Sequence, residues 1–72
     1  MGDIDFIIKE ILVLLNSELP DELQEYKTKF EDLVNKNLLR ASYDVIDELC
    51  RQKKWKVPIQ LKGLLDKYKA VF

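Results

Sequence analysis

The sequence predicts an all-α protein, a compact antiparallel bundle of about four short helices. Three features of its composition lead to this prediction. Only two glycines and two prolines occur in 72 residues, apolar residues make up 47% of the chain, and charged residues make up 35%. Good helix formers such as Leu, Lys and Glu are frequent in the rest. Because a chain this short supports only one hydrophobic core, residues 1–72 are expected to form a single helical domain.

The first helix is expected from about Ile4 to Asn16. Asp3 precedes it as a candidate N-cap, because its carboxylate can accept hydrogen bonds from backbone N–H groups that have no partner within the helix. The apolar residues recur at helical spacing and define a core face. That face comprises Ile4, Ile7, Ile8, Ile11, Leu12 and Leu15.

The second helix is expected to begin at Pro20, since a proline at the first helical position loses no hydrogen bond. Asn35-Lys36-Asn37 is expected to end it, because Asn tolerates the left-handed conformation that closes helices. Its inner seam comprises Leu19, Leu23, Tyr26, Phe30, Leu33 and Asn37, with Val34 beside it.

The third helix is expected from about Leu38 to Lys53. Its inner face comprises Leu39, Ser42, Tyr43, Ile46, Leu49 and Cys50, with Leu38 and Val45 alongside. Pro58 disfavours helical geometry at Val57, so the chain is expected to open there and to form a last helix from Pro58 to about Ala70. The buried stripe of that helix comprises Leu61, Leu64, Leu65, Tyr68 and Phe72. Gly63 lowers its stability by about 1 kcal/mol relative to Ala.

The composition argues against an enzyme and against a metal or other cofactor. The chain has no His, the commonest general base near neutral pH and a common metal ligand. Its one cysteine, Cys50, is expected in the core, with no His to activate it. The adjacent acidic pairs Glu31-Asp32 and Asp47-Glu48 point about 100° apart on a helix and do not converge on one point.

The sequence predicts a cytoplasmic protein without a membrane span. Its longest apolar run, residues 11–15, is five residues long, whereas a transmembrane helix needs about 20. The first residues lack the basic region and small-residue cleavage site of a secretory signal. A single cysteine gives no indication of an oxidising compartment.

Charge is distributed unevenly along the chain. Residues 1–49 hold twelve acidic and five basic residues, a net of −7, whereas residues 50–72 hold one acidic and seven basic residues, a net of +6. The two parts either neutralise each other in the fold or present a field to a partner. In the basic part, Arg51 to Lys56 includes Trp55, a mixture typical of nucleic-acid contact segments. The alternative is that the bases complement a helix C-terminus and that Trp55 covers the end of the core.

Phe6 and Val13 form a second candidate site. At 100° per residue they point away from the core face of the first helix and give it a small apolar patch on its other side. A helix that is apolar on two sides is either buried between neighbours or placed at an interface. Both interpretations, core packing and a partner or homodimer surface, stay open at this point.

The segment from Ser42 to Cys50, followed by Val57-Pro58 and the repeat Leu61, Leu64, Leu65, resembles the C-terminal half of the small helical bacterial immunity proteins of the MafI type. The resemblance covers residues 38–68. It implies a protein that binds and neutralises a toxin made by the same cell.

An acidic helical face suits such an inhibitor, because a nuclease toxin presents a cationic surface. The residues expected to supply this face are Asp21, Glu22, Glu25, Asp32, Asp44, Asp47 and Glu48. The sequence therefore predicts a protein-binding module, and the resemblance implies an immunity or inhibitor protein that neutralises a cationic toxin domain. The alternatives are a small nucleic-acid-binding regulator that uses Arg51 to Lys56 and a self-associating structural bundle.

Overall fold

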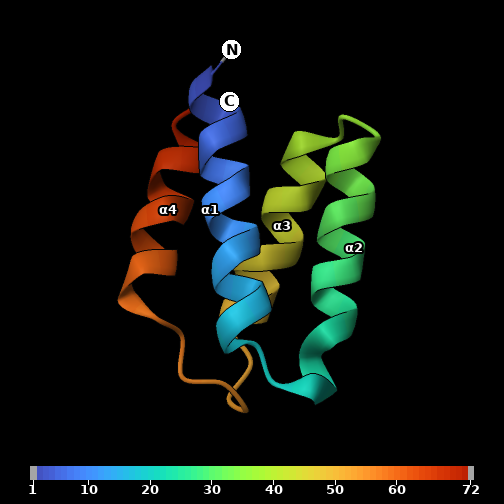
Figure 1. Cartoon of the computed structure of the whole chain (residues 1–72), viewed down its shortest axis with the longest axis vertical. Coiled ribbons are helices and arrows are strands. Elements are labelled where there is room, and N and C mark those ends of the chain that lie inside the picture. Colours follow the sequence, from blue (N-terminus) through green and yellow to red (C-terminus); the bar gives the residue numbers. More distant parts are fainter. Residues whose placement is uncertain (1, 72) are drawn as a thin grey trace.

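The all-α prediction is confirmed. The structure, a computed structural model, describes residues 2–71. Its elements are α1 (Gly2–Glu18), the 3-10 turn η1 (Asp21–Leu23), α2 (Gln24–Asn35), α3 (Leu39–Cys50) and α4 (Ile59–Lys69). The helices run alternately down and up, so each is antiparallel to the next along the chain (Figure 1). Around the bundle, α1 packs beside α4, α4 beside α3, and α3 beside α2.

The connections between the helices follow the expected stop signals. Asn37 has a positive φ of 60°, and its N–H donates to the carbonyl of Val34 while the N–H of Leu38 donates to the carbonyl of Leu33, both at 2.9 Å. This pairing closes α2 as a Schellman motif, with Asn in the left-handed position. Pro20 and Pro58 have extended backbones directly before η1 and α4.

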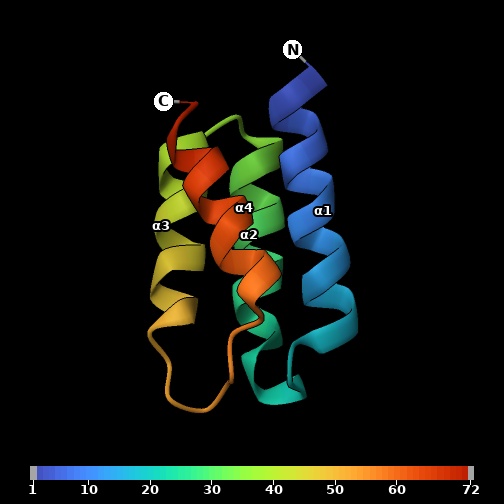
Figure 2. The ribbon, with the colours of Figure 1, turned by 90° about the vertical axis from the view of Figure 1, so that its left-hand side faces the viewer.

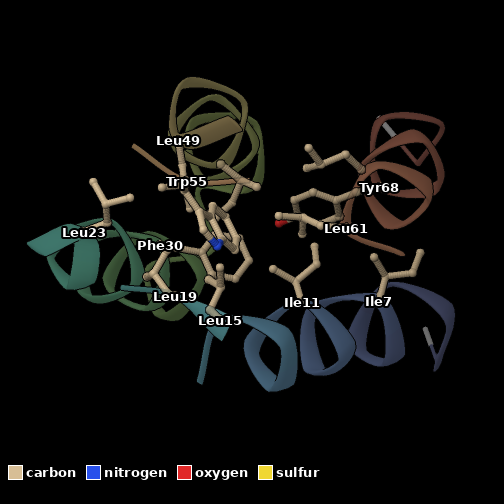
Figure 3. Packing of buried hydrophobic residues seen from close by; sticks show 12 residues of the cluster. Ile7, Ile11, Leu15, Leu19, Leu23, Phe30, Leu49, Trp55, Leu61 and Tyr68 are labelled. Carbon is tan, nitrogen blue, oxygen red and sulfur yellow. The ribbon is translucent and has the colours of Figure 1, made fainter. Parts of the chain in front are cut away.

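Three predicted boundaries differ from the structure. α1 begins at Gly2, so Asp3 lies inside its first turn rather than at the cap. α2 begins only at Gln24, after the single turn of η1. α3 ends at Cys50, so Lys53 lies in the following loop and not in the last turn of the helix. The loop must leave the helix axis there because Trp55 turns back into the core (Figure 3).

The core lies between all four helices and follows the predicted inner faces (Figure 3). Its buried apolar residues are Ile7, Ile11, Leu15, Leu19, Leu23, Phe30, Ile46, Leu49, Trp55, Leu61, Leu65 and Tyr68. The ring of Tyr68 meets Phe30 edge to face, with centroids 6.4 Å apart. These contacts hold α4 against the α2–α3 pair.

Three predicted inner-face residues are less buried than expected. Asn37, the last residue of the predicted seam of the second helix, is exposed in the turn that closes α2. Leu38 is 50% exposed, because it lies in the turn before α3 begins. Cys50, the last residue of α3, is half-buried and packs against the edge of the core. Phe72 lies outside the described residues. None of the helices described within residues 2–71 combines the length and the apolar character that a membrane span requires.

Candidate functional site

Phe6 and Val13 are exposed on α1 and not part of the core. Their side chains are 61% and 56% exposed, so the interpretation that they pack inside the monomer is wrong. Both border a hollow of about 360 Å³ between α1 and α4. The residues that line it are Phe6, Glu10, Val13, Leu14, Gln60, Gly63, Leu64 and Lys67.

A second hollow continues the first toward the end of the bundle where both termini lie (Figure 2). Its volume is about 380 Å³, and it is lined by Asp3, Phe6, Ile7, Lys67, Ala70 and Val71. Phe6 and Lys67 border both hollows, so together they form one groove, called here the α1–α4 groove. From Asp3 to Val13 the groove follows about 15 Å of helix at 1.5 Å per residue.

Gly63 leaves a recess in the α4 wall of this groove. A Cβ atom placed on Gly63 would have no heavy atom of the described chain within 4 Å. No internal contact therefore requires glycine at this position, although glycine in a helix costs about 1 kcal/mol relative to alanine. The α1 wall, by contrast, carries the exposed side chains of Phe6 and Val13.

The rim of the α1–α4 groove carries charges of both signs. Glu10 lies on the α1 wall and Lys67 on the α4 wall. Among the described residues neither takes part in an ion pair, because the pairs that form lie within α2 and α3 and at their ends. The groove thus combines an apolar floor with one acidic and one basic edge.

No protein-family model, curated protein or solved structure matches this chain.

Three of the predicted acidic residues pair with bases one helical turn away. The Asp32 carboxylate lies 3.0 Å from the Lys36 ammonium, and Asp47 lies 2.9 Å from Arg51. Asp44 lies 3.8 Å from the guanidinium of Arg40. Exposed pairs of this kind contribute little stability. They do, however, offset part of the negative field that these carboxylates would present.

Asp44 and Asp47 also share a polar hollow of about 390 Å³ between α3 and α4. Its lining comprises Arg40, Tyr43, Asp44, Asp47, Arg51 and Lys69, which is three bases and two acids. This part of the predicted acidic face is therefore of mixed charge.

Asp21, Glu22 and Glu25 lie apart from that hollow, exposed at η1 and the first turn of α2. This junction is at the same end of the bundle as the loop that carries Lys53 and Lys56 (Figures 1 and 2). Glu48 is exposed on α3. The seven predicted carboxylates are thus spread over several parts of the surface, and bases lie beside Asp32, Asp44 and Asp47.

The basic loop lacks the accessible aromatic side chain that a nucleic-acid contact segment needs for stacking on bases. Trp55 is buried, and its indole points into the core beside Leu49 (Figure 3). Lys53, Lys54 and Lys56 are exposed around it. Because stacking on bases needs an accessible ring face, Trp55 anchors the loop instead and leaves only the lysines for phosphate.

Cys50 has the environment of an unreactive thiol. Burial, the largest effect, and the neighbouring Asp47 raise its pKa to about 11, and Lys62 acts in the opposite direction. A thiol with a raised pKa is protonated near neutral pH and is a poor nucleophile. Among residues 2–71, no group of three or more acidic or cysteine side chains is placed to hold a metal ion.

Sequence reasoning found the α1 wall of the groove but missed the α4 wall. Gln60, Leu64 and Lys67 follow one another at steps of four and three, which places them on one side of α4, and Val71 follows four residues later in the turn after the helix. That spacing was the available signal. No sequence signal indicated the recess at Gly63. A glycine in a helical segment predicts only a less stable helix, and the residues that surround it are known only from the structure.

Proposed function

We propose that this chain is a protein-binding module whose binding surface is the α1–α4 groove. The observation that carries the proposal is the exposure of Phe6 and Val13 along a groove whose opposite wall is recessed at Gly63. Exposed large apolar side chains that gather around a hollow mark interaction sites, whereas single ones are common on any surface. Ile59, 84% exposed but outside the groove, is such a single case.

The groove suits recognition better than chemistry. Its apolar wall offers area that gains free energy when it leaves water, and its two edges, Glu10 and Lys67, can orient an occupant by charge. Apolar anchors surrounded by polar groups are the usual anatomy of a protein-binding surface.

Photo-crosslinking at two adjacent positions tests this proposal. Gln60 lines the groove, whereas its neighbour Ile59 points elsewhere and is exposed. A photoreactive amino acid at position 60 should give a defined covalent adduct with a protein in the cells that make this chain. The same amino acid at position 59 is the matched control and should give none.

The adduct at position 60 should disappear when Phe6→Ser and Val13→Ser are combined, while the thermal melting temperature, measured at low protein concentration, stays nearly unchanged. Exposed positions of this kind usually change stability by less than about 0.5 kcal/mol. Equal crosslinking at positions 59 and 60, or no adduct at position 60, would contradict the proposal.

A second candidate function is inhibition of a cationic protein such as a toxin domain, as the resemblance to the immunity proteins implies. The observation that favours it is the group Asp21, Glu22 and Glu25, exposed within two turns and outside the ion pairs of the described chain. These carboxylates also complement the N-terminal end of α2. Exposed charges of this kind steer association more than they hold a complex.

Charge reversal at that junction tests the second candidate. With the protein identified by crosslinking as the partner, Asp21→Lys with Glu25→Lys should lower the association rate and its dependence on salt. Lys53→Glu with Lys56→Glu, at the same end of the bundle, is the control of opposite sign and should leave the rate unchanged or raise it. A rate that is insensitive to both changes would exclude steering by this surface.

A further inference from the structure

We infer that the occupant of the α1–α4 groove is a second copy of this chain, which forms a two-fold symmetric dimer. This inference rests on the proposed function, since it names the partner of the same groove. It commits to one arrangement: the two-fold axis runs along the groove, so that α1 of each copy lies over α4 of the other. Self-complementary faces of this kind are the commonest basis of soluble homodimers.

The shapes of the two walls favour this arrangement. The α1 wall protrudes, because Phe6 and Val13 stand exposed on it. The α4 wall is recessed at Gly63, where the space for a side chain is open. With the axis along the groove, the protruding wall of each copy meets the recessed wall of the other. Two copies therefore fit each other twice by the same contact.

The charges on the rim favour the same axis. Glu10 lies on the α1 wall and Lys67 on the α4 wall, so placing α1 over α4 brings opposite charges to the same edge of the interface. An axis across the groove would instead place α1 over α1, so that the edge that carries Glu10 in one copy faces the same edge of the other. Like charges facing each other across an interface disfavour that alternative.

The size of the face is sufficient for a dimer. The bundle measures 33 × 23 × 19 Å between its outermost Cα atoms, so one long side can supply the roughly 800 Å² per partner of a standard interface. That is about a sixth of the 5036 Å² surface of the chain. Because the exposed apolar residues cover only part of this side, we expect a dissociation constant in the micromolar range, as for weak interfaces.

Sedimentation equilibrium on the full chain tests the inference. Between about 10 µM and 1 mM, a micromolar dimer should change from partly to almost fully associated. Phe6→Ser with Val13→Ser should weaken association by about tenfold or more, since each removes an apolar anchor. Ile59→Ser removes an even more exposed apolar residue outside the groove and should leave association unchanged.

Two further variants test the arrangement without removing apolar area. Gly63→Leu fills the recess with a good helix former in open space, so the chain should fold and fail to dimerise. Glu10→Lys and Lys67→Glu should each weaken the dimer, and the two together should restore it, because the swap returns opposite charges to each edge.

The inference is overturned if the chain sediments as a monomer at about 1 mM, or if the dimer survives Phe6→Ser with Val13→Ser or survives Gly63→Leu. Failure here is distinguishable from failure of the proposed function. A monomer that still gives an adduct of another mass at position 60 keeps the protein-binding groove and rejects the second copy. A monomer that gives no adduct rejects both.

Discussion

The hydroxyl of Tyr68 on α4 lies 2.6 Å from the hydroxyl of Ser42 on α3, and both residues are fully buried. Ser42 also lies 2.7 Å from the carbonyl of Leu39. A carbonyl can only accept, so the single proton of Ser42 is donated to Leu39, and Tyr68 donates to Ser42. The hydrogen bond thus joins α4 to α3 inside the apolar core.

Tyr68→Phe should lower the free energy of unfolding by about 1 kcal/mol, because it removes the hydroxyl and leaves Ser42 bonded to Leu39. Tyr68→Ala should cost about 3 to 5 kcal/mol, since the ring also packs against Phe30. Urea denaturation of both variants gives the two values. Equal losses would mean that the ring contributes nothing beyond its hydroxyl, contrary to the packing described here.

Gly63→Ala should raise the free energy of unfolding by about 0.5 to 1 kcal/mol. The added methyl group enters open space, and alanine restricts the unfolded chain more than glycine does. Lys62→Ala, at the exposed neighbouring position, is the control and should be nearly neutral. Denaturation should be followed at low protein concentration, where self-association does not contribute. A loss of stability in Gly63→Ala would show that there is no open space for a side chain at position 63.

The melting temperature should fall as the pH rises from about 9 toward 11. The pKa of Cys50 is raised from its ordinary value of 9.0 to about 11, so the unfolded chain releases this proton at lower pH than the folded chain. The stabilisation is fully present below pH 9 and is lost through that window. Burial also raises the pKa of Tyr68 above its ordinary value of 10.0, which adds to the loss at its upper end.

Cys50→Ala separates the two contributions, because it removes the thiol and keeps the tyrosine. The variant should show a shallower fall between pH 9 and 10 than the natural chain in a series of thermal melts. An identical pH dependence in both proteins would mean that Cys50 titrates normally in the fold.

The fluorescence of Trp55, the only tryptophan, should show the blue-shifted emission of a buried indole and should stay unchanged when single-stranded DNA is added. Its ring lies in the core and has no exposed face for a base. Lys53→Glu with Lys56→Glu serves as the control for any effect of phosphate on the loop. A spectral change on adding DNA that this variant abolishes would support the nucleic-acid alternative.

The helical faces could be predicted from sequence because the spacing of apolar residues alone defines them. Ile7, Ile11 and Leu15 are buried as their positions on a helix require. The end of α3 could not be predicted in this way. It depends on where Trp55 finds a place in the core, and that place is built by Leu49 and residues distant in sequence (Figure 3).

The candidate site likewise has features that sequence spacing predicts and features that depend on the tertiary structure. The seven-residue spacing of Phe6 and Val13 predicts that they lie on the same side of α1. Their exposure depends on how far α4 covers α1, and the spacing of apolar residues in either helix alone does not determine this. The acidic residues of α3 illustrate the converse. Asp44 and Asp47 have bases four residues away in the sequence, so their partial neutralisation was predictable from spacing.

The order of helices around the bundle gives the groove a particular place in folding. α2 and α3 are joined by only three residues and pack on each other, so this hairpin can form with little loss of loop entropy. The α1–α4 groove, in contrast, is assembled from the first and the last helix (Figure 1). Its two walls meet only after the rest of the chain is in place. A folding intermediate with α4 detached would lack the groove and would expose Ile7 and Ile11 instead. A partner that binds the groove therefore binds only the fully folded chain.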